Sequence, residues 1–271
     1  MAGRRASGRR AHWWLPPVPS EHGARSMLAV ALLTPLSVGY GRGWDVSEHT
    51  LLAYLCFTLL AAGILFFREA VRRRLRVPSE FQRSLTAVSL VEGAVILLLV
   101  GVLVVLQGRA WIGGLLIIPG VLGDVWIRRD GYPIPMGGEM AGVLALSLAV
   151  PVGAMVLGMS FTPAGILLYG LFVGFHALGL VRVKTARNRD ADWYREGIAF
   201  DMGSHGIVAL IVGIAWFVGW TGIAAPLIFL AALGWAVWLV LREKALPVRT
   251  LGKRERALSL LFVLGGPWLL P

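Results

Sequence analysis

A set of ionisable side chains lies within or beside long apolar runs, where charge is costly and function is the usual reason for it. In chain order they are Glu21, His22, Glu92, Asp124, Glu139, His176 and His205. Carboxylates and imidazoles can exchange protons or hold polar groups of a ligand. No pair has the spacing of a metal motif such as His-Glu-x-x-His. We therefore expect ligand binding or acid–base chemistry here rather than a metal site, although Glu21, His22, Glu139 and His205 have suitable ligand types.

Each of these residues also has a purely structural interpretation. Glu21 follows a serine that can cap a helix, where a carboxylate favours the helix dipole. Glu139 follows two glycines and can play the same part, and Asp124 is one turn from Arg128, which suits an ion pair. Polar residues such as His176 also bond between membrane helices. Helix capping does not explain Glu92, His176 and His205. These three residues are predicted to lie at the same depth in the membrane.

Two cationic segments each follow an apolar run, at 66–74 and 181–189. Arginine forks and lysine charges at the edge of the bilayer suit phosphate or carboxylate headgroups. The candidate ligands of such a headgroup are Arg68, Arg72, Arg182, Lys184 and Arg187. The alternative is ordinary membrane topology, with these cations only setting orientation and touching anionic lipids.

The elements that carry these residues are predicted to be membrane-spanning helices. Of the 271 residues, 57% are hydrophobic and 15% are charged, whereas soluble domains have about 25% charged residues. The apolar runs are continuous rather than alternating, which indicates helices and not a barrel. The predicted fold is all-α, a polytopic membrane helix bundle of about nine transmembrane helices. Their expected bounds are 21–41, 50–67, 85–106, 110–127, 138–158, 162–182, 203–220, 222–241 and 256–270.

The net charge of +11 does not indicate a nucleic-acid partner, because the cations lie in short loops between apolar runs. With a cytoplasmic N-terminus, all but two of the 26 Lys and Arg residues fall on the cytoplasmic side, Arg42 and Arg109 being the exceptions. We expect a multi-pass protein of the bacterial inner membrane, with its C-terminus outside if nine helices cross. Residues 1–20 form a basic cytoplasmic or interfacial segment, and residues 21–271 form a single transmembrane domain.

The predicted helix directions place all the ionisable residues named above in the cytoplasmic third of the bundle. A weak internal repeat agrees with this placement. Glu21 corresponds to Glu139, and Glu92 corresponds to His205, as two parallel halves of four helices would require. A cavity that opens to the cytoplasm is therefore expected.

Two short motifs indicate a family. The segment Pro19-Ser20-Glu21-His22-Gly23-Ala24 resembles the Pro-x-x-His-Gly-Ala start of YwiC-like membrane proteins, and Val183-Lys184-Thr185-Ala186-Arg187 is similar to a later segment of that family. The resemblance implies a small bacterial multi-spanning membrane protein, and the family has no established activity to carry over.

The architecture also resembles that of UbiA-type membrane prenyltransferases, which have nine helices, a parallel pseudo-repeat and a lipidic cavity facing the cytoplasm. Those enzymes hold magnesium and an isoprenoid diphosphate with Asp-rich motifs after helices 2 and 6. Here Glu69 stands among arginines at the first position, and Lys184 and Arg187 occupy the second. Magnesium chemistry needs clustered carboxylates, so the sequence argues against this mechanism.

The sequence supports three hypotheses, and it indicates neither a cofactor nor whether the protein is an enzyme. The first is a binding or transfer protein for an amphiphile with an anionic head, such as a lipid, an isoprenoid or a quinone-like molecule, with membrane lipids as its surroundings. The second is a divergent UbiA-like prenyltransferase. The third is a small-molecule transporter, although its polar residues would be expected near the bilayer midplane.

Overall fold

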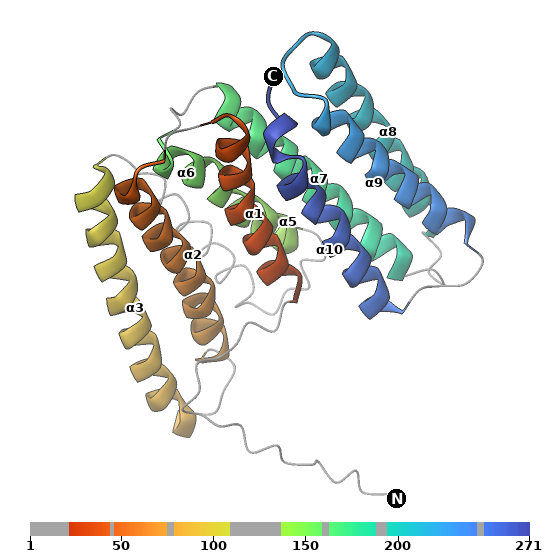
Figure 1. Ribbon diagram of the computed structural model, residues 1–271. Coiled ribbons are helices and arrows are strands. Elements are labelled where there is room, and N and C mark those ends of the chain that lie inside the picture. The colour runs from red at the N-terminus through yellow and green to blue at the C-terminus, as the bar shows by residue number, and fades with distance from the viewer. Residues whose placement is uncertain are drawn as a thin grey trace, which may run out of the picture.

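A computed structural model describes residues 22–43, 46–74, 79–108, 137–158, 163–187, 194–242 and 247–271. These residues form helices and no strand, which confirms the predicted all-α membrane bundle (Figure 1). The helices are α1 His22–Gly41, α2 Glu48–Arg74, α3 Ser79–Gln107, α5 Gly137–Ser147, α6 Ala149–Val156, α7 Pro163–Arg187, α8 Tyr194–Phe217, α9 Ala224–Leu241 and α10 Val248–Leu264, followed by the 3-10 helix η1 Gly266–Trp268.

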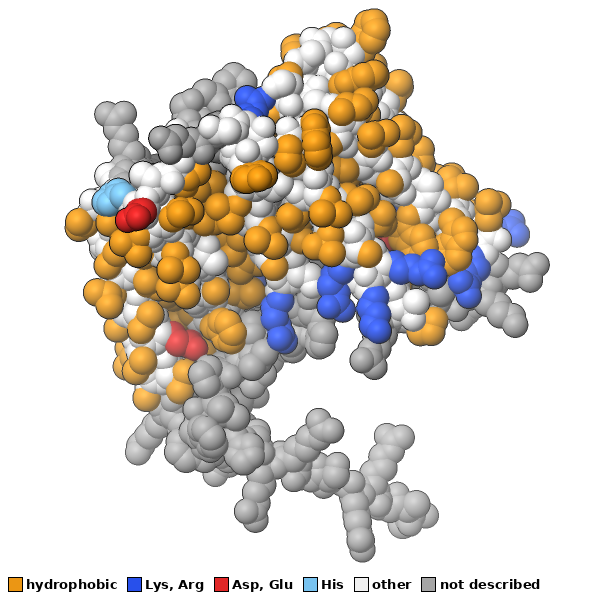
Figure 2. Space-filling view, in the orientation of Figure 1, with side chains coloured by type: hydrophobic (Ala, Val, Ile, Leu, Met, Phe, Trp, Pro, Cys, Tyr) orange, Lys and Arg blue, Asp and Glu red, His pale blue; other side chains and the backbone are white. Residues whose placement is uncertain are grey.

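Five of these helices are long and apolar enough to cross a membrane: Glu48–Val71, Thr86–Leu106, Gly165–Ala186, Tyr194–Phe217 and Ala224–Leu241. Their outer faces carry many exposed aliphatic side chains, as the apolar surface in Figure 2 shows. Such a surface is unfavourable in water and suits lipid. The chain is therefore a multi-pass membrane protein. The predicted helix at 110–127 lies outside the described residues, so the count of nine stays a prediction.

Several helices extend further than the hydropathy pattern predicts. α2 continues past residue 67 to Arg74, and α7 continues past 182 to Arg187, so the two cationic segments begin as helical turns and not as loops. α8 begins at Tyr194 instead of 203, and α10 at Val248 instead of 256. Arginine and lysine are good helix formers, and cations at a helix C-terminus suit its dipole. The expected bounds marked the edges of the apolar runs and missed these polar turns.

The helix expected at 138–158 is two helices, α5 and α6, separated at Leu148. Pro151 accounts for the break, because it has no N–H to donate to the carbonyl of Ser147, four residues earlier. The expected helix is therefore present as the apolar stretch Met140–Val156, with an interruption at Leu148.

By chain order we divide the described helices into a first group, α1 to α6, and a second group, α7 to α10; α1, α5 and α6 of the first group pack against the second, as Figure 1 shows. α10 and η1 pack against α1, and the Ser37 hydroxyl donates a hydrogen bond to the carbonyl of Val263. An aromatic cluster from α7, α9 and α10 fills the second group, with ring centroids of Phe175 and Phe262 5.0 Å apart. The core therefore includes the C-terminal helix, although that helix is amphipathic.

We call one end of the bundle the basic end: there α2, α7 and α9 end and α3, α8 and α10 begin (Figure 1). Most cationic side chains gather along this end in Figure 2. Those with described side chains are Arg25, Arg68, Arg182, Lys184, Arg195, Arg242, Lys253, Arg254 and Arg256. Arg42 lies at the opposite end, just after α1. The positive-inside rule predicts that the basic end faces the cytoplasm.

Candidate functional site

A buried charge pair joins α7 to α10. Arg182 on α7 is 1% exposed. Its Nε and Nη2 atoms donate to the two carboxylate oxygens of Glu255 on α10, each at 2.8 Å. Its Nη1 donates to the carbonyl of Ala232 on α9 at 2.8 Å. This bidentate geometry is the strongest form of an arginine–carboxylate contact.

The same guanidinium contacts His205 on α8. Arg182 Nη1 lies 2.9 Å from His205 Nε2. A guanidinium can only donate, so Nε2 must accept. His205 Nδ1 lies 2.8 Å from the carbonyl oxygen of Asp201, which can only accept, so Nδ1 carries the hydrogen. The hydrogen-bond pattern thus assigns a neutral imidazole that joins α8 to α7.

Asp201 is the second carboxylate of this cluster and is buried. Its Oδ1 lies 3.2 Å from His205 Nδ1 and makes no hydrogen bond. We call Arg182, Asp201, His205 and Glu255 the buried charge cluster. Three helices contribute its side chains and α9 contributes a carbonyl, so the cluster ties together all four helices of the second group.

Trp235 links the buried charge cluster to the surface. Its indole N–H donates to Glu255 Oε1 at 2.8 Å, and its ring stacks on Trp238 with centroids 4.8 Å apart. The Arg254 guanidinium lies over both rings, at 5.0 Å and 4.8 Å from their centroids, and Arg242 lies 5.1 Å from the Trp238 centroid. A path of contacts therefore runs from exposed cations to the buried pair.

Gly179 makes room for the Glu255 carboxylate. A Cβ at this position of α7 would lie 3.2 Å from Glu255 Oε2 and 3.7 Å from Arg182 Nη2. Small residues of this kind let membrane helices approach closely. The absence of a side chain at Gly179 is thus part of how α10 docks on α7.

The structure brings two predicted site residues, Arg182 and His205, into direct contact. It also gives Arg182 partners that the sequence did not suggest, because its N–H groups bond to Glu255, Ala232 and His205. Lys184 lies two residues further along α7 and is half-buried. That these residues bind a ligand stays a prediction.

His176 lies on α7 among aromatic rings. Its imidazole centroid is 4.4 Å from that of Phe172 and 5.4 Å from that of Phe175. Its Nε2 atom is buried and makes no hydrogen bond. An unsatisfied buried nitrogen costs stability unless something bonds to it.

Arg68 and Glu92 lie on the α2–α3 pair, in the other group of helices. Arg68 is buried near the end of α2, beside the equally buried Glu69. Glu92 is half-buried on α3, and its Oε2 atom is buried without a hydrogen bond. The predicted residues therefore divide between two helix groups rather than forming one constellation.

The remaining predicted residues are not described in full. Glu21 and Asp124 lie outside the described residues. The backbone is helical at His22, Arg72, Glu139 and Arg187, but their side chains lie outside the description. Their part in a site stays a prediction. Within the described segments, no three His, Cys, Asp or Glu side chains are grouped so as to hold a metal ion.

Sequence reasoning missed Asp201, Trp235 and Glu255. The expected helices began at 203 and 256, which left both acids in loops. Two signals point to them. Asp201 and His205 are four residues apart, on one helix face. Glu255 shares a face of α10 with the buried Leu251, Ser259 and Phe262.

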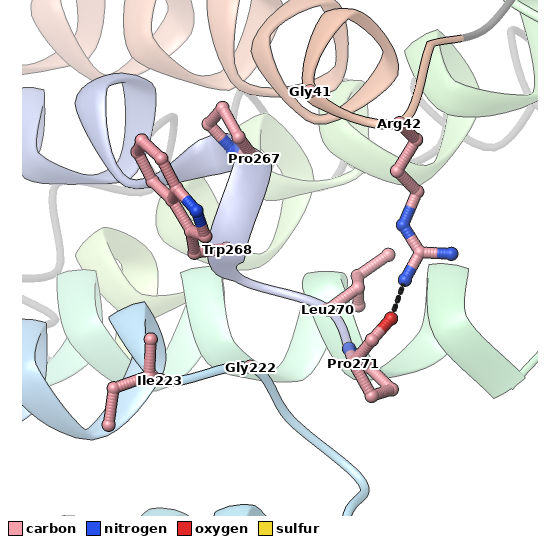
Figure 3. Close-up of a pocket in the computed structure, with 8 residues that line it drawn as sticks. All are labelled: Gly41, Arg42, Gly222, Ile223, Pro267, Trp268, Leu270 and Pro271. Carbon is pink, nitrogen blue, oxygen red and sulfur yellow. Dashed lines mark hydrogen bonds between the residues drawn. The ribbon is translucent and has the colours of Figure 1, made fainter.

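A shallow pocket of about 550 Å³ lies at the opposite end from the basic end, where α1 ends and the C-terminal segment passes the turn before α9. Figure 3 shows Arg42 reaching to the carbonyl of Pro271, to which it donates a hydrogen bond. Trp268 and Ile223 also line this pocket. None of the predicted site residues contributes to it.

Comparison with known proteins gives one result. The family model for YwiC-like proteins matches residues 18–154, which hold the Pro19–Ala24 motif and the helices through most of α6. No curated protein and no solved structure matches the chain. The buried charge cluster lies in α7 to α10, outside the matched residues. The match covers half of the chain and confirms the resemblance noted in the sequence: the chain belongs to the YwiC-like protein family.

Proposed function

We propose that this YwiC-like membrane protein binds an amphiphile with an anionic head, such as a lipid or an isoprenoid, at the basic end of its bundle. One observation carries the proposal: the described cations gather where long apolar helices end, and only Arg42 lies at the other end. Cations at that level attract a negative head, while apolar helices suit its tail.

Lys184 is the cation on which the proposal rests most directly. Arg182 belongs to the buried charge cluster, and we do not assign it to the headgroup. Lys184 is half-buried on the last turn of α7, and Arg68 is buried on the last turns of α2. We assign these two residues to the headgroup, together with Arg72 and Arg187 from the sequence.

His176 supports a ligand that also carries a polar group within its apolar part. Its Nε2 atom is buried among phenylalanine rings and makes no hydrogen bond. A carbonyl or hydroxyl of a quinone-like molecule can supply the missing hydrogen bond.

Native mass spectrometry of the gently extracted full chain tests the proposal. We expect the wild type to retain an anionic amphiphile. Lys184→Ala is expected to reduce the retained fraction about tenfold, since a hydrogen bond to a charged group contributes about 1.5–3 kcal/mol. Arg42→Ala removes the same charge at the other end and is the matched control. The proposal fails if no amphiphile is retained, or if both variants lose it equally.

Transport is a second candidate, favoured by the buried charge cluster, because ionisable groups in membrane helices often form relays for protons or substrates. Proton flux in vesicles, compared between wild type and His205→Gln, tests it, and an equal flux in both would remove its support.

A divergent prenyltransferase is tested by incubating the protein with polyprenyl diphosphates and aromatic acceptors, with and without magnesium.

A further inference from the structure

The corner at which α9 ends and α10 begins carries an unusual combination of groups, which we call the α9–α10 corner. Its members are Trp235, Trp238, Arg242, Lys253, Arg254 and Arg256. They belong to helices that contribute neither Lys184 nor Arg68, so the corner is distinct from the headgroup site proposed above.

The charges of this corner are segregated between inside and outside. In the segment Lys253–Arg256 the three cations are exposed, whereas Glu255 points inward and is 16% exposed. Glu255 is neutralised by Arg182 through both of its oxygens. Within the described segment Lys253–Arg256 the acid therefore does not offset the three exposed cations, whose charge attracts anions.

Two guanidinium groups share one indole ring. The Cζ atoms of Arg242 and Arg254 lie 5.1 Å and 4.8 Å from the centroid of Trp238. The two guanidinium groups are thus within about 10 Å of each other. The planar forks of arginine suit a phosphate.

The position of the corner at the edge of the membrane indicates that the anion is a lipid headgroup. α9 is apolar along its whole membrane span, Ala224–Leu241, and Arg242 follows at once. Trp238 lies one turn inside that boundary and is 38% exposed. Tryptophan beside arginine at the end of a span is typical of the headgroup layer.

We propose that the α9–α10 corner binds the phosphate of an anionic phospholipid from the surrounding leaflet. In this proposal Arg242 and Arg254 contact the phosphate. The cation–π contacts of Arg254 with Trp235 and Trp238 orient its guanidinium. Because Trp235 also donates to Glu255, the lipid site is coupled to the buried charge cluster through one side chain. The proposal stands independently of the amphiphile retained at Lys184.

Binding of an anionic phospholipid at the corner can be measured with spin-labelled lipids. The full chain is placed in bilayers of phosphatidylcholine with phosphatidylglycerol. The readout is the preference of the protein-bound layer for labelled phosphatidylglycerol over labelled phosphatidylcholine. We expect the double variant Arg242→Gln with Arg254→Gln to lower this preference at least fivefold, as about 1 kcal/mol per cation implies.

The matched control is Lys253→Gln with Arg256→Gln, which removes the same charge from the same corner without touching Trp238. We expect this control to lower the preference for phosphatidylglycerol by less than half of the change that the Arg242 and Arg254 double variant causes. Equal losses in the two double variants would overturn the proposal, because they would show only general surface charge. An unchanged preference in the Arg242 and Arg254 variant would overturn it as well. Retention of the amphiphile, measured on the same preparations, should be unaffected, which separates this test from that of the proposed function.

Discussion

Arg182 and Glu255, which are 73 residues apart in the chain, are joined through two parallel hydrogen bonds, each 2.8 Å long, between α7 and α10. The pair holds the polar start of α10 against α7. It adds to the packing of α10 on α1 and to the aromatic contact between Phe175 and Phe262.

Removing one partner of this pair should be costly. Glu255→Gln leaves the buried Arg182 cation without its counter-charge, and we expect a loss of about 3–5 kcal/mol in the free energy of unfolding. The double variant Arg182→Met with Glu255→Leu should lose less, because no buried charge remains unpaired. Thermal unfolding in detergent, compared across both variants, is the measurement. A single variant as stable as wild type would show that the pair is not needed.

His205 should tolerate one particular substitution better than others. Glutamine can place its Oε1 near the position of the imidazole Nε2 and accept the hydrogen bond from Arg182, which leucine cannot do. We expect His205→Gln to cost about 1 kcal/mol and His205→Leu about 1–3 kcal/mol more, since leucine leaves an N–H group of Arg182 unsatisfied. If both variants unfold at the same temperature, the Arg182–His205 hydrogen bond contributes nothing.

Two glycines of α7 should respond in opposite directions to the same change. Gly179→Ala pushes a methyl group to 3.2 Å from Glu255 Oε2 and should lower the unfolding temperature. Gly170→Ala, on the same helix, meets no atom within 4 Å and should raise stability by about 0.5–1 kcal/mol. The pair of variants separates the docking of α10 from general helix propensity. Stabilisation by both would contradict the close approach of α10 to Gly179.

His176→Phe distinguishes a ligand-binding nitrogen from a merely buried one. The change removes an unsatisfied polar atom and extends the aromatic cluster, so the protein without its amphiphile should become as stable as wild type or more stable. The same variant should retain less quinone-like ligand after extraction. A marked loss of stability in the ligand-free protein would mean that the imidazole has a structural partner.

The apolar elements could be predicted closely because their composition alone decides them. The runs expected at 21–41 and 222–241 match α1 and α9 to within two residues. The clustering of cations at the basic end also follows from the sequence, since helix ends alternate between the two sides of the bundle.

The polar turns could not be predicted from hydropathy, and the buried charge cluster lies in them. Asp201 and Glu255 belong to helical turns that precede the apolar runs. In such a charged segment, the sequence is equally compatible with a helix and with a loop. Asp201 lies beside His205 on its own helix, and this pair could have been found from its four-residue spacing. Glu255 is buried opposite Arg182 of α7, and this contact between helices is not encoded in any local sequence pattern.

The most direct test of the central claim is the amount of anionic amphiphile retained per protein molecule after gentle extraction, measured by native mass spectrometry for wild type, Lys184→Ala and Arg42→Ala. Our account predicts a retained ligand in wild type and in Arg42→Ala, and about a tenfold loss in Lys184→Ala. Retention that is the same in all three proteins, or absent from the wild type, would contradict it.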